Sequence, residues 1–211
     1  RENRFFFAYR LGDADQATVA VSTRFLNARN GIEQVRFSLG QTFYFQNPQL
    51  VLPTSKPVEA TSNMVAEIQA RLGEYWYVRG ALQWDSKEYA TERSNIFLQY
   101  HPAKNKIINL GYRYNKSIQE QADVSVQWPL SARWALLTRW NYALPEKRTL
   151  QSYTGFEYID CCWAFRITKG ERILADGNVD NPILFELELS GLAKFGPRPE
   201  SPLDAGRFIF E

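Results

Sequence analysis

Apolar and polar residues alternate along most of this chain with a period of two residues. The clearest example is residues 183–192, where Ile183 and Phe185 fall on one side of an extended strand. Glu186 and Glu188 fall on the other side. This period predicts β-strands with one apolar face, and the 3.6-residue period of an amphipathic helix does not recur.

The alternation predicts about twelve strands. The first is incomplete and ends near Arg10. The others cover residues 17–26, 32–46, 63–72, 75–85, 93–101, 106–115, 120–128, 133–143, 150–159, 162–172 and 183–194. Their mean length of about ten residues matches the roughly 9–11 residues that a tilted strand needs to cross a bilayer. Strands of soluble sheets are usually shorter, about five or six residues.

The links between these strands alternate in character. Tight turns are expected at residues 28–31, 73–74, 102–105, 129–132 and 160–161. The intervening links, at residues 11–16, 47–62, 86–92, 144–149 and 173–182, are mostly longer and polar, and residues 116–119 are a short exception. Short turns on one side and longer loops on the other are typical of outer-membrane barrels, whose short turns are periplasmic. A soluble sandwich with one solvated face is the alternative.

The two faces of the predicted strands differ in chemistry. Trp and Tyr lie near strand ends on the apolar face, where interfacial aromatic girdles occur in barrels. The polar face carries Arg24, Arg36, Glu67, Arg71, Gln99, Arg113, Asp123, Arg139, Glu157, Arg166, Glu186 and Glu188. Charged and amide side chains in this number do not face hydrocarbon, so the fold class expected is an all-β, transmembrane antiparallel β-barrel with a polar lumen.

Composition narrows the function. The 211 residues carry a formal net charge of +2, which favours neither a nucleic-acid partner nor an anionic surface. Mean hydropathy is −0.40, and no apolar run is long enough for a transmembrane helix. No metal, cofactor or phosphate-loop motif is found, and His101 is the only histidine. Neither an enzyme, nor a metal site, nor a cofactor, nor a nucleic-acid partner is therefore expected.

The two cysteines, Cys161 and Cys162, are adjacent in an expected short turn. Neighbouring cysteines bond to each other only with strain. A strained vicinal disulfide and partners elsewhere remain open, whereas two thiols with no adjacent His or carboxylate cluster make a poor metal site.

The chain starts at Arg1 without a Met start or a signal peptide, so we expect a piece of a longer protein. Residues 1–195 are assigned to the C-terminal part of a barrel. Residues 196–211 contain Pro197, Pro199 and Pro202 and are assigned to an irregular, periplasmic C-terminal extension.

Several stretches resemble one family of barrels. They are Ser22-Thr23-Arg24-Phe25, Phe37-Ser38-Leu39-Gly40-Gln41 with Phe43-Tyr44-Phe45, Trp128-Pro129-Leu130 with Arg133-Trp134, Gly155-Phe156-Glu157-Tyr158, Asp160-Cys161-Cys162-Trp163-Ala164-Phe165-Arg166, and Phe185-Glu186-Leu187-Glu188-Leu189-Ser190-Gly191-Leu192. In order and spacing they resemble the C-terminal region of the LPS-assembly protein LptD family. The paired cysteines in a tight turn, two strands from the end, are the most specific element.

The resemblance implies about twelve C-terminal strands of a 26-stranded barrel in the Gram-negative outer membrane. It also implies a periplasmic jellyroll domain that contacts an LPS-bridge protein, and an LptE-type lipoprotein that plugs the lumen. The remaining strands of the barrel lie outside this sequence. The implied function is insertion of lipopolysaccharide into the outer leaflet through the lumen and a lateral gate. A general porin or substrate channel is the alternative.

The resemblance also implies site residues. Cys161 and Cys162 would form two disulfides with cysteines near the start of the full protein. Residues 183–194 would be the last strand and one lip of the gate, with Ile183, Phe185, Leu187, Leu189 and Gly191 as its residues. Gly191 either weakens the pairing of this strand or relieves crowding at a barrel rim.

Arginines on the polar face are candidates to bind the phosphorylated, sugar-rich head of lipopolysaccharide, because a guanidinium binds phosphate through two hydrogen bonds. The candidates are Arg24, Arg36, Arg113, Arg139 and Arg166. The alternative for each is a structural role, balanced by Glu157, Glu186 and Glu188 or in contact with the plug lipoprotein.

Overall fold

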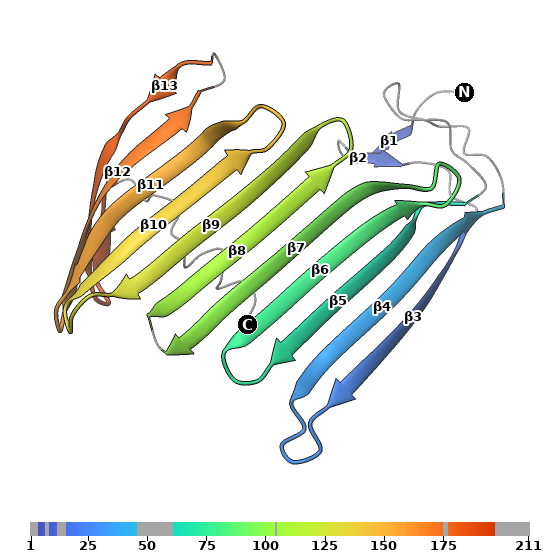
Figure 1. Cartoon of the computed structure of the whole chain (residues 1–211), viewed down its shortest axis with the longest axis horizontal. Coiled ribbons are helices and arrows are strands. Elements are labelled where there is room, and N and C mark those ends of the chain that lie inside the picture. The colour runs from blue at the N-terminus through green and yellow to red at the C-terminus, as the bar shows by residue number, and fades with distance from the viewer. Residues whose placement is uncertain are drawn as a thin grey trace.

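One large antiparallel sheet makes up most of the protein (Figure 1). The computed structural model describes residues 4–6, 9–11, 16–45, 61–103, 105–174 and 177–196. The strands of the large sheet are β3 (Gln16–Leu26), β4 (Glu33–Tyr44), β5 (Met64–Leu72), β6 (Trp76–Asp85), β7 (Ala90–Ala103), β8 (Lys106–Asn115), β9 (Gln119–Pro129), β10 (Trp134–Ala143), β11 (Arg148–Ile159), β12 (Trp163–Ile173), β13 (Val179–Asp180), β14 (Ile183–Leu189) and β15 (Ala193–Phe195).

The strands lie in chain order, and each pairs with the next except that β14 follows β12, with the short β13 also on β12. Strands β3 to β12 are 9 to 14 residues long. Figure 1 shows them tilted and side by side in a curved sheet. The predicted strands from residue 17 to residue 172 are confirmed. Among the described residues no helix is long and apolar enough to cross a membrane.

The two ends of the chain differ from prediction. The sequence predicts a single first strand that ends near Arg10, but β1 (Arg4–Phe6) and β2 (Tyr9–Leu11) pair with each other in a separate two-stranded antiparallel sheet. The strand expected over residues 183–194 ends at Leu189. Residues 190–192 form a turn, and β15 folds back onto β14. The expected extension lies outside the described residues from residue 197 onward.

The loop asymmetry is smaller than expected. Strands β7 and β11 begin earlier than predicted, so the links before them shrink to residues 86–89 and 144–147. The short turns at the opposite end stand as predicted. In the β3–β4 turn, Gly31 has a φ of 69°, a left-handed conformation that glycine adopts without a side-chain clash.

The interior of this fold is polar. The most deeply buried side chains are Gln99, Gln127, Glu157, Asn109 and Ser125. Large apolar side chains on the opposite face are exposed, among them Val21, Phe25, Ile96 and Phe185. A soluble sandwich buries its apolar face against a second sheet, so this arrangement contradicts the sandwich alternative and fits a barrel wall with an apolar outer face.

Candidate functional site

Strand register places the candidate residues on one face of the sheet. A row of directly opposite residues runs from Arg36 on β4 through Arg79 and Phe97 to Asp123 and Asn141. Side chains two residues apart share a face, so register brings all twelve predicted polar residues to the same surface. We call this surface the polar face. The prediction of which residues line it is confirmed.

The opposite, apolar face ends in rows of aromatic rings. At the short-turn end Trp76 lies 4.5 Å from Tyr100, and Tyr158 lies 5.1 Å from Trp134 and 5.2 Å from Trp163, between ring centroids. Such rings at strand ends are characteristic of the membrane interface. The apolar face therefore has the chemistry of a lipid-facing surface.

A buried chain of polar side chains crosses the polar face near the short turns. Gln99 donates to Asn109 at 2.9 Å, and Asn109 donates to Ser125 at 3.1 Å. Further along, the Gln127 amide lies 3.5 Å from a Glu157 carboxylate oxygen. We call these residues, with Arg166 and Glu186, the polar belt. Buried polar groups are stable when they hydrogen-bond to one another. The belt therefore links side chains of β7, β8, β9, β11, β12 and β14, and the contact from Gln127 to Glu157 spans β10.

Arg166 is the centre of the charged end of the belt. Its guanidinium lies 2.5 Å from Glu157, 2.9 Å from Glu186 and 3.4 Å from Glu188. The side chains of Glu157 and Glu186 are each only 3% exposed. Lys194 on β15 is 3.0 Å from Glu188 and extends the network to the edge of the sheet. Arg166, predicted as a lipopolysaccharide contact, is thus fully engaged by carboxylates.

Three more of the five predicted arginines have carboxylate partners. Arg36 donates two hydrogen bonds of 2.8 Å to Glu33, and Arg24 lies 4.0 Å from the same carboxylate. Arg139 donates to Asp123 at 3.0 Å. These pairs leave Arg113 as the one candidate for which the described residues show no carboxylate partner.

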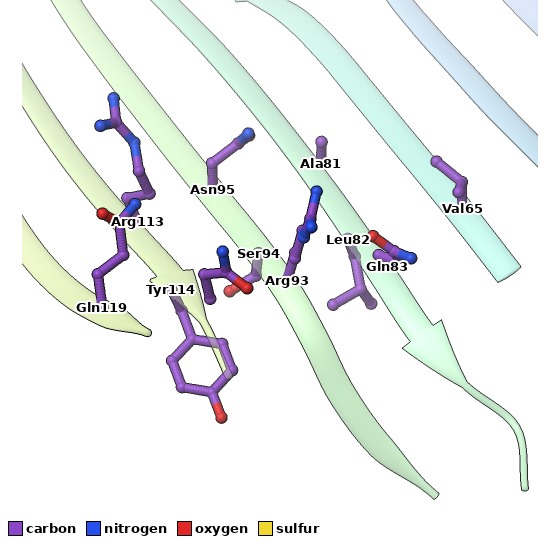
Figure 2. A pocket seen from close by; sticks show the side chains of 11 residues that line it. Val65, Ala81, Leu82, Gln83, Arg93, Ser94, Asn95, Arg113, Tyr114 and Gln119 are labelled. Atoms are coloured by element: carbon purple, nitrogen blue, oxygen red, sulfur yellow. The ribbon is translucent and has the colours of Figure 1, made fainter. Parts of the chain in front are cut away.

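The sequence-based list missed two arginines of the same kind. Arg79 on β6 and Arg93 on β7 lie on the polar face and are exposed, as Arg113 on β8 is. Within the described residues neither has an ion pair. Figure 2 shows Asn95 between Arg93 and Arg113. Alternation alone places both on the polar face, but only the structure shows which arginines are unpaired.

Two adjoining cavities are lined in part by these arginines. One, of about 280 Å³, is lined by Arg93, Arg113 and Asn95 with Gln83 and Gln119 (Figure 2). The other, of about 480 Å³, is lined by residues that include Arg79, Phe97, Asp123, Arg139 and Asn141, and it shares Arg113 and Asn95 with the first. We call Arg79, Arg93, Arg113 and Asn95 the arginine patch. Its chemistry suits an anion with hydrogen-bonding groups around it.

Carboxylates of Asp85, Glu88 and Glu92 come within 4.8 Å of one another beside the β6–β7 link. The Lys116 ammonium lies 2.9 Å from Glu92 and also contacts Glu88. Hydrogen bonds to Glu88 and then Glu92 raise the pKa of Lys116 well above its usual range. Lys116 thus supplies the positive charge that balances this group.

Cys161 and Cys162 lie in the β11–β12 turn, at the short-turn end, as predicted. Both are exposed and form no disulfide with each other. The turn is closed by a hydrogen bond of 2.9 Å from the Asp160 amide to the Trp163 carbonyl. A hydrogen bond with Cys162, then desolvation and the Asp160 charge, raise the pKa of the Cys161 thiol.

Of the five residues expected to form the gate strand, four lie on β14 and one lies outside it. Ile183, Phe185, Leu187 and Leu189 lie on β14 and share its apolar face. Gly191 lies in the turn after β14 and has a φ of 77°. The expectation that Gly191 weakens the pairing of the last strand is therefore wrong. β15 occupies the outer edge of β14 opposite Leu187–Leu189.

Together, antiparallel strands of membrane-crossing length, an apolar face with aromatic ends and a polar inner face define the class of outer-membrane β-barrels. The sheet in this chain is part of such a barrel wall.

Comparison with known proteins identifies the family. The family model described as LptD, LPS transport system D, matches residues 1–140. An LPS-assembly protein LptD of Nitrosococcus oceani is 35% identical over 204 residues, which cover 96% of this chain and 28% of that protein. That of Thiobacillus denitrificans is 33% identical over 93% of this chain and 27% of its own length. That of Shewanella denitrificans is 32% identical over 100% of this chain and 30% of its own length.

This chain therefore belongs to the LptD family, whose members act in lipopolysaccharide transport and assembly. It spans 27–30% of the length of these three relatives.

Proposed function

We propose that this chain is the part of an outer-membrane translocon that carries one lip of a lateral gate, through which lipopolysaccharide enters the outer leaflet. The observation that carries the proposal is the contrast between the two faces: exposed, unpaired arginines on the polar face, and an exposed apolar face on the other side of the same strands. Such a wall accommodates a charged, sugar-rich head group inside while acyl chains stay in lipid.

The gate lip in this proposal is β14. β15 pairs with Leu187–Leu189, and Gly196 lies against the backbone of Phe185 and Glu186. Among the described residues, the part of this β14 edge without a neighbour is therefore Ile183–Leu184. Unpaired strand edges have unsatisfied backbone groups that recruit another strand. We propose that the strand that completes the barrel pairs there, over few residues, and separates to let lipid pass.

A cross-link tests the gate. One cysteine replaces Leu184 on β14 and a second is placed on the facing strand of the full-length protein, in cells that depend on it. The matched control is a Thr154–Lys169 cysteine pair, which staples the directly opposed and already paired strands β11 and β12. The proposal predicts that the gate cross-link stops lipopolysaccharide from reaching the surface and that the control does not. Normal growth with an efficient gate cross-link contradicts it.

We also propose that Cys161 and Cys162 form disulfides with cysteines elsewhere in the full-length protein, which tie the barrel to a periplasmic jellyroll domain. Their exposure at the short-turn end, without a disulfide to each other, supports this. Disulfides between distant parts of a chain change its mobility on a denaturing gel. The full-length protein should therefore shift on reduction, and the Cys161→Ser/Cys162→Ser variant should run like the reduced protein. Equal mobility before and after reduction rules the disulfides out.

The partners proposed are lipopolysaccharide, an LptE-type plug lipoprotein, and a periplasmic bridge protein that docks on the jellyroll domain. Of the arginines predicted to contact lipopolysaccharide, Arg24, Arg36, Arg139 and Arg166 are better assigned to structure or to plug contacts, because carboxylates already engage them. The proposed role is transport without covalent chemistry, and hence without an enzyme's active site.

A general channel is the second candidate, because an arginine-lined lumen also suits an anion-selective pore. Conductance of the purified complex in planar bilayers separates the two. Steady ion flow with the plug lipoprotein in place favours the channel, whereas a closed complex that opens only without the plug favours the translocon.

A further inference from the structure

The arginines of the arginine patch differ in their charge partners from the other arginines of the polar face whose ion pairs are described. Arg24, Arg36, Arg139, Arg166 and Arg172 each have a carboxylate partner. Within the ranges that the structure covers, the three arginines of the patch have none. Like charges on neighbouring strands repel one another, so this patch costs the fold free energy unless an anion neutralises it.

Strand register places the three arginines of the patch at neighbouring positions around Asn95. Arg113 is directly opposite Asn95, Arg93 is two residues from Asn95 on the same strand, and Arg79 is diagonal to it, opposite Phe97. Diagonal neighbours in an antiparallel pair are about 7–8 Å apart, within reach of long side chains. The three arginines therefore project from neighbouring positions of β6, β7 and β8 around Asn95 on the polar face.

The polar residues that line the two cavities beside the arginines are mostly amides, although register also places Glu67 diagonal to Arg79 outside the cavities. Gln83, Gln119 and Asn115 line the smaller cavity, and Gln121 and Asn141 line the larger one. The one carboxylate among the lining residues, Asp123, already accepts a hydrogen bond from Arg139. An amide offers both donors and an acceptor, and therefore suits hydroxyl groups. Half-buried Phe97 adds an apolar surface beside them.

We propose that the arginine patch is a binding site for a phosphorylated saccharide, with a phosphate on Arg79, Arg93 and Arg113 and the sugar hydroxyls on the surrounding amides. The two cavities, of about 280 and 480 Å³, lie near the lower end of the range of small-molecule sites, about 300–1,000 Å³. The proposal rests on the proposed function in that lipopolysaccharide supplies such a head group, but its test is a binding measurement independent of transport.

The test uses the full-length protein with its plug lipoprotein in detergent. Three probes are titrated by calorimetry: the phosphorylated core oligosaccharide released from lipopolysaccharide, the same oligosaccharide after chemical dephosphorylation, and inorganic phosphate. The variants are Arg79→Gln/Arg93→Gln/Arg113→Gln, its three single substitutions, and Arg24→Gln as a control on the same face. Arg24 is exposed, and its carboxylate partner lies at 4.0 Å.

The phosphorylated oligosaccharide should bind the wild-type complex and the Arg24→Gln control alike. Each single patch substitution should weaken binding of the phosphorylated oligosaccharide about tenfold, because it removes one charge-assisted hydrogen bond to the phosphate. The triple variant should bind it no better than wild type binds the dephosphorylated probe. Added salt should weaken binding to wild type, because exposed charges are screened.

Three results overturn the proposal. They are equal affinity of wild type for the phosphorylated and dephosphorylated probes, equal affinity for inorganic phosphate alone, and unchanged binding by the triple variant. Loss of the plug lipoprotein from the triple variant, with no oligosaccharide binding by wild type, shows instead that the patch is a protein contact.

Failure of the site and failure of the transport function are distinguishable. If the oligosaccharide does not bind but the full-length protein still delivers lipopolysaccharide to the surface of depleted cells, only the site is wrong. If the cells do not need the protein for delivery, the transport proposal is wrong whatever the calorimetry shows. A heat-induced shift in gel mobility, the same in wild type and triple variant, confirms that the variant is folded.

Discussion

The polar belt and the arginine patch occupy the same face of the same sheet, yet they differ in burial and in whether their charges are balanced. In the belt, Glu157 and Glu186 are almost completely buried, and Arg166 lies between them. In the patch, Arg93 and Arg113 are exposed beside a cavity and have no carboxylate partner among the described residues. The belt's charges balance one another, whereas the patch's do not. The first arrangement stabilises a wall, and the second is available to a ligand.

The largest effect should come from removing the centre of the belt. In Arg166→Met, Glu157 and Glu186 remain buried without a counter-charge, and breaking a buried pair in this way costs about 3–5 kcal/mol. The full-length protein in detergent should therefore unfold at clearly lower urea concentration. Arg172→Met is the matched control on the same strand and face: its side chain is 49% exposed next to Asp180, and exposed pairs contribute about 0–1 kcal/mol. Equal urea midpoints for the two variants contradict the structural role of the belt.

A smaller loss should follow from adding one methyl group beside the belt. A Cβ at Gly155 would lie 2.1 Å from the Ile167 carbonyl oxygen, so β11 and β12 must separate in Gly155→Ala. Overpacking of this kind costs about 1–3 kcal/mol. Gly111→Ala is the control, because its nearest atom lies at an ordinary 3.5 Å. If both alanine variants keep the wild-type urea midpoint, close β11–β12 contact is not what supports the belt.

Substitutions in the patch should leave stability almost unchanged. Each of Arg79→Gln, Arg93→Gln and Arg113→Gln alters an exposed side chain, and such changes stay within about 0.5 kcal/mol. Because the three guanidiniums no longer repel one another, the triple variant should be slightly more stable to urea than the wild type. Urea titration beside Arg166→Met measures the contrast. A loss for the triple variant as large as that of Arg166→Met would erase the distinction between the two regions.

The smallest effect concerns reactivity at the turn that joins the belt strands β11 and β12. Because the pKa of the Cys161 thiol is raised, chiefly by its hydrogen bond with Cys162, less thiolate is present at neutral pH. After reduction, alkylation of Cys161 should therefore be slow near pH 7 and rise at a pH above the usual cysteine range of about 8.5. Cys162→Ser changes that hydrogen bond and should therefore shift the pH at which the alkylation rate of Cys161 rises. If the alkylation rate of Cys161 rises at the usual cysteine pKa of about 8.5 in both proteins, this description of the turn is wrong.

Much of the wall was predictable from sequence, because alternation determines which face each residue occupies. The polar residues from Arg24 to Glu188 share a face as expected, and the strands between residues 17 and 172 match within a few residues. Periodicity does not report where a chain reverses on itself. The alternation therefore predicts one strand where the chain forms the β14–β15 hairpin. It also places Gly191 in that strand, although Gly191 is a left-handed residue in a turn.

The state of each arginine was not predictable, because pairing depends on register between strands. Arg139 reaches Asp123 on the neighbouring strand β9, and Arg166 reaches carboxylates on β11 and β14. Arg79 and Arg93 occupy equivalent positions in the alternation but have no acid opposite them. The distinction between structural and ligand-facing arginines thus follows from the assembled sheet and not from the pattern of any one strand.

The most direct test is photo-cross-linking in cells that export lipopolysaccharide. A photoreactive residue replaces Asn95, at the centre of the patch, and in a second strain replaces Ser22, which lies on the same face of β3 and hydrogen-bonds to Ser38 at 2.9 Å. We predict an adduct with lipopolysaccharide at Asn95 that disappears when lipopolysaccharide synthesis is blocked, and little or none at Ser22. An adduct at Asn95 with the plug lipoprotein alone, unaffected by that block, would contradict the account.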